Sequence, residues 1–174
     1  MHRGALLTLP NILSLSRLAL VPAFVLVATP GARAAIVVAA GLTDLLDGWL
    51  ARRRRAATRV GAILDPIADR LFVLGALVVL LLEGALSVWQ GLLLLTRDVA
   101  TTIGFFVARA SSDLRGVELK ARLPGKVVTV LQIVALLAAL LAPALVGPLA
   151  VATCVASIVA IADYTLMLRR GRAA

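Results

Sequence analysis

Four aspartates stand out in a short stretch of an otherwise apolar chain, GLTDLLDGWLARRRRAATRVGAILDPIADR, which covers residues 41–70. Asp44 and Asp47 are three residues apart, and Asp65 and Asp69 are four apart. On helices, each pair would share one face. Four carboxylates brought together repel one another unless a cation lies between them. Hard oxygen ligands suit Mg²⁺, Mn²⁺ or Ca²⁺, and neither Cys nor His is at hand to favour zinc.

Two small residues and a cation follow the first aspartate pair. Gly48 and Ala51 continue the helical face of that pair, and they leave room for a ligand to approach the backbone. Arg52 is placed to reach phosphate oxygens with a charged fork. Since Mg²⁺ in such a site typically serves a phosphate or diphosphate, the pattern predicts a metal-dependent reaction on a phosphorylated, lipidic substrate. The alternative, structural salt bridges to neighbouring arginines, fits one aspartate better than four.

The composition places these residues in a membrane protein. The 174 residues are 61% hydrophobic with a mean hydropathy of +1.03, whereas soluble domains are roughly 45–50% apolar. We expect one all-α, polytopic membrane domain over residues 1–174, with a short interfacial N-terminal lead-in over residues 1–11. Apolar runs of roughly 18–24 residues predict six transmembrane helices, at about 12–29, 33–52, 60–82, 87–108, 124–142 and 147–168.

Turn-forming residues separate the predicted helices. The first helix resembles a cleaved signal peptide in its apolar core and in the small residues near Ala34, but Arg17 interrupts the apolar run, and the basic segment before it is only His2 and Arg3. We therefore expect a retained helix. The breaks between helices are Pro30-Gly31, Glu83-Gly84, Pro143 and Gly147-Pro148.

Positive charge gathers in alternate connections between the predicted helices. The net charge of +9 would also suit a nucleic-acid-binding protein, but Lys and Arg fall between apolar runs, so we expect no nucleic-acid partner. By the positive-inside rule, the basic connections, both termini and the aspartates face the cytoplasm, in the inner membrane of a bacterium. The clusters are Arg52, Arg53, Arg54, Arg55 and Arg59; Arg109, Arg115, Lys120, Arg122 and Lys126; and Arg169, Arg170 and Arg172.

The aspartate stretch resembles the motif of the CDP-alcohol phosphotransferase family. All eight fixed positions of that motif are present over 26 residues, which makes the resemblance specific. It extends to LPNILSLSRLALVP near the start, TRDV at 96–99 and GKVVTVLQ at 125–132, and so covers most of the chain. The motif reads Asp44-x₂-Asp47-Gly48-x₂-Ala51-Arg52-x₈-Gly61-x₃-Asp65-x₃-Asp69.

The resemblance implies a fold, a reaction and a cofactor. The fold is a six-helix membrane domain that forms a homodimer among membrane lipids. The reaction transfers the phosphatidyl group of CDP-diacylglycerol to an alcohol and releases CMP, with two divalent ions, Mg²⁺ or Mn²⁺. Carried over to this chain, Asp44, Asp47 and Asp65 would hold one ion. Asp44, Asp65 and Asp69 would hold the other, and Asp69 would also be the general base.

The resemblance further assigns the CDP-lipid site. Gly48, Ala51 and Arg52 would line the cytidine and diphosphate, and Gly61 would permit close packing there. The metal ions would neutralise the diphosphate and the charge that grows on the CMP leaving group. The acceptor hydroxyl would lose its proton to the base as it attacks the lipid-side phosphorus.

The acceptor is less clearly indicated. Arg97 and Asp98 lie well inside the fourth predicted helix, where a structural pair is one interpretation. The other is that Arg97 binds an anionic acceptor together with Lys126, and with Lys120 or Arg17. Excess positive charge favours a phosphate-bearing alcohol, either glycerol 3-phosphate, as in phosphatidylglycerophosphate synthases, or phosphatidylglycerol, as in cardiolipin synthases. We expect glycerol 3-phosphate, although Asp98 after Arg97 favours the second group.

Other classes of protein fit less well. A transporter or channel would place acidic residues near the bilayer midplane, often in internal repeats, rather than at one cytoplasmic end. Aspartate-rich membrane prenyltransferases are larger, and their motifs are farther apart. An inactive scaffold would be expected to lack some motif residues. Asp163 and Tyr164, near the end of the sixth predicted helix, receive no functional role.

Overall fold

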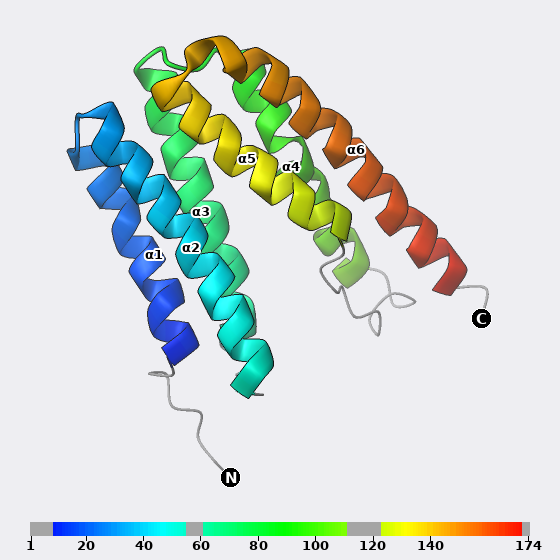
Figure 1. The fold of residues 1–174 in the computed structure, drawn as a ribbon. Coiled ribbons are helices and arrows are strands. Elements are labelled where there is room, and N and C mark those ends of the chain that lie inside the picture. Colours follow the sequence, from blue (N-terminus) through cyan, green and yellow to red (C-terminus); the bar gives the residue numbers. More distant parts are fainter. Residues whose placement is uncertain (1–8, 55–60, 111–122, 172–174) are drawn as a thin grey trace. The chain divides into compact units, whose positions relative to one another are not determined.

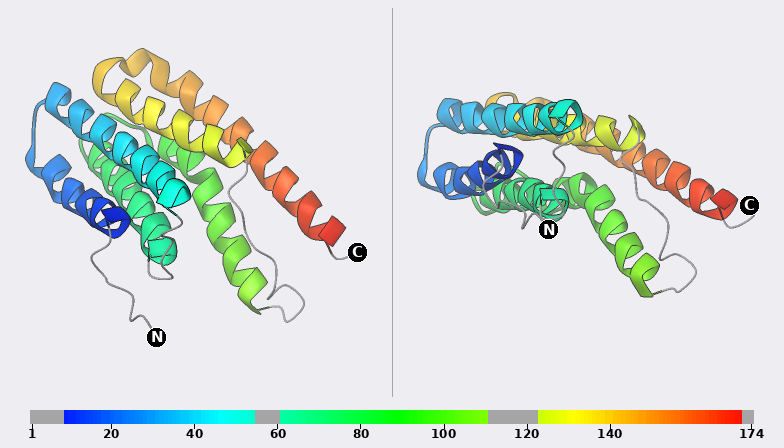
Figure 2. Two further views of the ribbon diagram at one scale, coloured as in Figure 1. Left: turned by 60° about the horizontal axis from the view of Figure 1, so that its bottom comes forward. Right: turned by 90° about the horizontal axis from the view of Figure 1, so that it is seen from below.

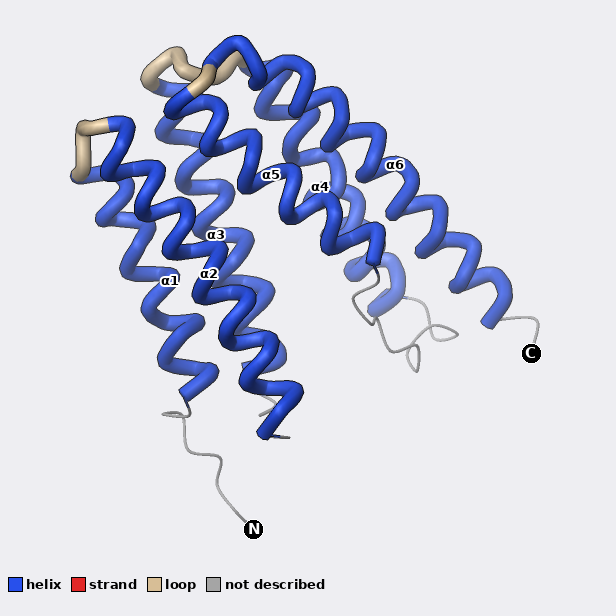
Figure 3. The backbone as a smooth tube through the Cα atoms, viewed as in Figure 1, coloured by secondary structure: helices blue, strands red, loops and turns tan. Residues whose placement is uncertain are grey.

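Where its structure is described, the chain folds into helices joined by short turns. The computed structural model describes residues 9–54, 61–110 and 123–171, and these contain six α-helices, a single 3₁₀ turn and no strand (Figures 1 and 3). The predicted all-α class is therefore confirmed. The elements are α1 (Leu9–Leu26), α2 (Pro30–Arg54), α3 (Gly61–Leu82), α4 (Val88–Ala110), α5 (Leu123–Leu141), η2 (Pro143–Leu145) and α6 (Val146–Gly171).

The helix ends follow from the turn-forming residues. Pro30 begins α2, where its missing N–H would have had no helical partner. Gly84 adopts a φ of 72°, a left-handed conformation that reverses the chain after α3. The α4 helix begins with half of a capping box, because the Ser87 N–H donates to Gln90 Oε1 over 2.9 Å. The predicted bounds differ by up to three residues, as at Leu9 against the predicted start at 12.

One predicted break lies inside a helix. Gly147 and Pro148 were expected to mark the break before the sixth predicted helix, and both lie in the first turn of α6, which begins at Val146, one residue before the predicted start. A proline in a first turn removes no helical hydrogen bond, so the chain turns instead at Ala142 and the 3₁₀ segment that Pro143 begins.

The chain divides into two compact units. The N-terminal unit contains α1, α2 and α3, from residues 1–85 and 139–141, and the C-terminal unit contains α4, α6 and most of α5, from residues 86–138 and 142–174. In the N-terminal unit, α1 packs against both α2 and α3 (Figure 2). In the C-terminal unit, α4 packs against α6.

Helices α1 and α3 approach closely in the core of the N-terminal unit. Phe24 and Phe72 meet edge to face, with ring centroids 6.3 Å apart and an interplanar angle of 81°. A Cβ added at Gly75 would lie 2.9 Å from Val21 Cγ1, closer than side-chain carbons normally approach. Glycine at 75 therefore permits this helix separation.

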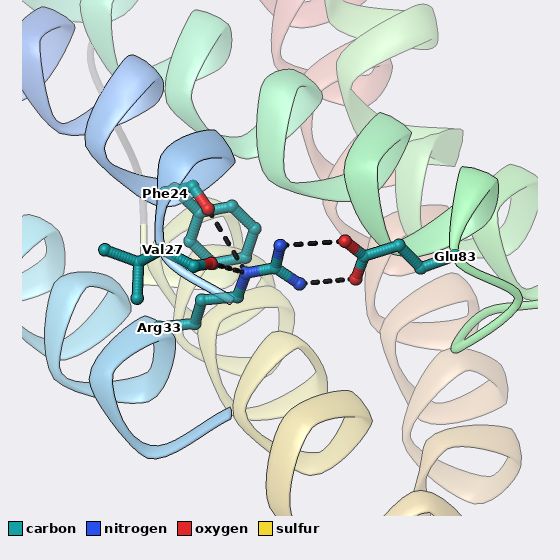
Figure 4. Close-up of polar contacts among 4 residues, drawn as sticks. All are labelled: Phe24, Val27, Arg33 and Glu83. Carbon is teal, nitrogen blue, oxygen red and sulfur yellow. Dashed lines mark hydrogen bonds and ion pairs between the residues drawn. The ribbon is translucent and has the colours of Figure 1, made fainter. Parts of the chain in front are cut away.

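An ion pair joins the ends of all three helices of the N-terminal unit (Figure 4). Arg33 is buried near the start of α2, and its guanidinium donates from Nη1 and Nη2 to both carboxylate oxygens of Glu83, just beyond α3. Its Nε donates to the carbonyls of Phe24 (3.2 Å) and Val27 (2.6 Å), at the end of α1. The charge also lies 5.3 Å from the centroid of the Phe24 ring.

Large apolar side chains point outward from both units, as expected for a protein surrounded by lipid. Val25, Leu82, Leu92 and Val155 are all more than half exposed. By length and apolarity, one described segment qualifies as a membrane span, the 21 residues Pro143–Asp163. Shorter apolar helical stretches cover Ser16–Leu26, Pro30–Thr43, Arg70–Leu82 and Gly125–Leu141. Two of these, Pro30–Thr43 and Arg70–Leu82, adjoin the aspartate motif.

Candidate active site

The two aspartate pairs lie on α2 and α3. The end of α2 and the start of α3 lie at the same end of the N-terminal unit (Figure 1). Asp44 and Asp47 belong to the second half of α2, and Asp65 and Asp69 to the first nine residues of α3. The chain leaves α2 and enters α3 at the same end of this unit, which is also the end where α1 starts (Figure 1). The predicted helical spacing of each pair is therefore confirmed at the level of the backbone.

The side chains of the four aspartates lie outside the described residues. The same holds for Gly48, Ala51 and Arg52 on α2 and for Gly61, the first residue of α3. Among the side chains that are described, no group of three or more His, Cys, Asp or Glu could hold a metal. The donor set itself fits hard divalent cations, because four carboxylates carried by two helix ends supply only oxygen ligands.

A buried arginine lies in the helix that packs on both aspartate-bearing helices. Arg17 is fully buried in the first half of α1, the half nearer the aspartate end of the unit, and it takes part in an interaction within the chain. A guanidinium is costly to bury unless its charge is compensated. Its place in α1 keeps Arg17 a candidate for binding an anionic group.

The remaining acceptor candidates belong to the C-terminal unit or lie outside the described residues. Arg97 lies in α4, with its side chain not described, and Lys126 is exposed in the first turns of α5. Lys120 lies in the undescribed segment between these two helices. The structure therefore places the helices that carry Arg97 and Lys126 in one unit, and Arg17 in the other.

Sequence reasoning missed the residue that links α4 and α5. Gln132 is 3% exposed in α5, and its Nε2 donates to the Leu94 carbonyl and to Asp98 Oδ2, each over 2.7 Å. A structural pair of Arg97 and Asp98 was one of two interpretations, and the Asp98 carboxylate also accepts a hydrogen bond from another helix. The available signal was a lone glutamine in a long apolar helix, which membrane segments seldom contain without a function.

Asp163 and Tyr164 gain no functional role. Asp163 is half-buried in α6 and has an interaction partner within the chain, as expected of a structural residue. The side chain of Tyr164 lies outside the described residues.

Comparison with known proteins identifies the family of sequences that this chain resembles. The family model for CDP-alcohol phosphatidyltransferases matches residues 7–164, which cover the helices of both units. A putative cardiolipin synthase of Mycobacterium tuberculosis is 43% identical over 118 residues, 64% of this chain and 56% of that protein. A probable phosphatidylglycerophosphate synthase of the same organism is 40% identical over 168 residues, 91% of this chain and 77% of that protein.

A third relative covers less of the chain. The cardiolipin synthase (CMP-forming) of Streptomyces coelicolor is 43% identical over 101 residues, 53% of this chain and 47% of that protein. The matched region thus spans about half the length of the two cardiolipin synthases and about three quarters of the glycerophosphate enzyme.

Proposed function

Because the chain belongs to the CDP-alcohol phosphatidyltransferase family, we propose that it transfers the phosphatidyl group of CDP-diacylglycerol to an alcohol and releases CMP. The observation that carries this proposal is the placement of Asp44, Asp47, Asp65 and Asp69 on two helices at one end of the N-terminal unit. A transporter or channel is not favoured, because the acidic residues gather at a helix end rather than along a pathway.

The four aspartates would hold two divalent ions, Mg²⁺ or Mn²⁺. Asp44, Asp47 and Asp65 form one proposed ligand set, and Asp44, Asp65 and Asp69 the other. When bound, such ions supply positive charge that neutralises a diphosphate and a leaving phosphate. Gly48, Ala51, Arg52 and Gly61 belong to the same helix ends, and we place the cytidine diphosphate of the lipid against them.

Asp69 is the proposed general base. Its carboxylate accepts the proton of the acceptor hydroxyl while the acceptor oxygen bonds to the lipid-side phosphorus. The bond between that phosphorus and the bridging oxygen breaks, and CMP leaves with the electron pair. Arg52 donates to phosphate oxygens during this exchange and holds the diphosphate in place.

Glycerol 3-phosphate is the acceptor that we favour, which makes the activity that of a phosphatidylglycerophosphate synthase. The relative so named is matched along 91% of this chain. The exposed Lys126 and the buried Arg17 add positive charge that suits a phosphate-bearing acceptor. Arg97 and Lys120 complete the proposed acceptor set.

Phosphatidylglycerol is the second candidate acceptor, which would make the chain a cardiolipin synthase. Two relatives with that name are 43% identical over shorter regions. Asp98 follows Arg97, which is the sequence pattern of that group. The Asp98 carboxylate accepts a hydrogen bond from Gln132 and so helps to hold α4 and α5 together.

The proposed setting is a bacterial inner membrane crossed six times by one domain, with both termini and the active site in the cytoplasm and a homodimer as the assembly. The clustering of basic residues in alternate connections supports this orientation. In the N-terminal unit, the end of α2 and the start of α3, which adjoin the first basic connection, lie at the same end (Figure 1).

CMP release from CDP-diacylglycerol in detergent tests the reaction. With Mg²⁺, addition of glycerol 3-phosphate should stimulate release strongly, and mass spectrometry should detect phosphatidylglycerophosphate. Chelation of divalent ions should stop the release. Stimulation by phosphatidylglycerol alone, with cardiolipin as product, would replace the favoured acceptor by the second candidate. No metal-dependent release with either acceptor would contradict the reaction itself.

A further inference from the structure

Among the described side chains of α5, those on the buried face are apolar except at one position. Val128, Ala135 and Leu136 are each at most 1% exposed, and Gln132 lies among them with 3% exposed. An amide buried on such a face is unfavourable unless its hydrogen bonds are made. A leucine at 132 would fill this space equally well, so we attribute the glutamine to the hydrogen bonds that it makes.

Both hydrogen bonds of this amide reach one turn of α4. Nε2 is the atom that must face α4, because both partners, the Leu94 carbonyl and the Asp98 carboxylate, accept hydrogen bonds and neither donates. The bond to Asp98 is charge-assisted and therefore the stronger of the two kinds. Two bonds from one nitrogen fix the level at which Gln132 lies along α4.

The position of Gln132 along α4 also sets how far apart two residues of the proposed acceptor set lie along the two helices. Arg97 directly precedes Asp98 on α4, and Lys126 lies six residues before Gln132 on α5. At the helical rise, six residues correspond to about 9 Å along α5. A slip of α5 along α4 would therefore move Lys126 relative to Arg97 by the same distance as the slip.

We propose that Gln132 is a positioning residue for the acceptor: by binding Asp98 and the Leu94 carbonyl, it keeps α4 and α5 in the register that lets Arg97 and Lys126 bind one phosphate together. This inference rests on the proposed function. It gives a role to a residue that is not part of the proposed metal, CDP-lipid or acceptor-binding set, and it gives Asp98 the role of anchor rather than ligand.

The test compares Gln132→Leu with Ser157→Ala. Leucine keeps most of the glutamine volume but donates no hydrogen bond. Ser157 is equally buried in the same unit, yet it donates only to the Thr153 carbonyl of its own helix, over 2.6 Å, so its loss breaks no bond between helices. Protein that elutes as a single species in detergent is used for each variant.

Two readouts are measured, the KM values in the CMP-release assay and the equilibrium binding of radiolabelled glycerol 3-phosphate. We expect Gln132→Leu to raise the KM and the Kd for glycerol 3-phosphate about tenfold, with the KM for CDP-diacylglycerol changed less than twofold. Ser157→Ala should leave all three constants unchanged. In the Asp98→Leu background, Gln132→Leu should have a smaller effect than in the wild type, since the bond to Asp98 is already absent and only the bond to the Leu94 carbonyl remains to be lost.

Equal binding of glycerol 3-phosphate by wild type and Gln132→Leu would overturn the positioning role, whatever the CMP assay gives. An equal rise in the KM for glycerol 3-phosphate and the KM for CDP-diacylglycerol would also overturn it, because it would indicate that Gln132 stabilises the fold as a whole. Binding that weakens as expected without any CMP release would support the positioning role and contradict the proposed reaction. No binding by the wild type would remove this acceptor and the positioning role with it.

Discussion

Replacing Gly75 by alanine tests how tightly α1 and α3 are packed in the unit that carries the aspartates. Alanine favours a helix over glycine by about 0.8–1.0 kcal/mol. The new Cβ would lie 2.9 Å from Val21 Cγ1, and valine in a helix is held to one χ1 rotamer, so the methyl group cannot rotate away cheaply. Forcing an extra carbon into a packed interface costs about 1–3 kcal/mol.

The balance predicts that Gly75→Ala destabilises the protein by up to about 2 kcal/mol. At about 2–4 °C per kcal/mol for a chain of this length, Tm should fall by as much as about 8 °C. In the Val21→Ala background the methyl carbon that clashes is absent. The same substitution at Gly75 should then raise Tm by about 2–4 °C, because only the helix preference remains.

Tryptophan fluorescence during heating in detergent measures the Tm of the wild type, Gly75→Ala, Val21→Ala and the double variant. Gly31→Ala is the matched control. A Cβ at Gly31 would meet nothing within 4 Å, so this variant should melt at or slightly above the wild-type temperature. If Gly75→Ala raised Tm equally in the wild-type and the Val21→Ala backgrounds, the close approach of α1 and α3 would be wrong. The change of sign between the two backgrounds is therefore the decisive observation.

Three further predictions concern single side chains. Hydrogen bonding by Arg33 lowers the pKa of Glu83 below its usual 4.5, so the stability from this pair should be present above pH 4.5 and lost as the pH falls through the lowered pKa. The variant Glu83→Gln should flatten this acid limb of a plot of Tm against pH. Gly84→Ala should lower Tm by about 2–4 °C, since an L-residue at a φ of 72° costs about 1 kcal/mol although space is free. Lys126→Ala should raise the KM for glycerol 3-phosphate several-fold and leave the KM for CDP-diacylglycerol unchanged, as measured by CMP release.

Local features of the sequence were sufficient to predict the six helices. Proline and glycine mark where helices start and the chain turns, so Pro30 and Gly84 were found at the expected places. Gly147 and Pro148 lie in the first turn of α6, which begins one residue before the predicted start at 147, so there the proline marks a helix start and not a turn of its own. The spacing of the aspartate pairs also required only the helical period, which the backbone confirms.

Contacts between distant parts of the chain could not be predicted in this way. Arg33, at the start of the second predicted helix, is buried and bound to Glu83, fifty residues later, and no local pattern indicates this partner. Gln132 was noticed only as part of a family-like stretch, because its partner Asp98 is 34 residues away on another helix. Hydrophobic periodicity places a residue on a face but does not indicate which polar group faces it.

The most direct test of the central claim is the rate of CMP release by Asp69→Asn, measured with Mg²⁺, CDP-diacylglycerol and glycerol 3-phosphate. Asp163→Asn serves as the control, since it removes a carboxylate from α6, outside the proposed site. A general base typically contributes about 10²–10⁴-fold to a rate. We expect Asp69→Asn to lose at least about 100-fold while its Tm stays near that of the wild type, and Asp163→Asn to remain active. Release by Asp69→Asn at a rate close to the wild-type rate would contradict the assignment of the aspartates to catalysis.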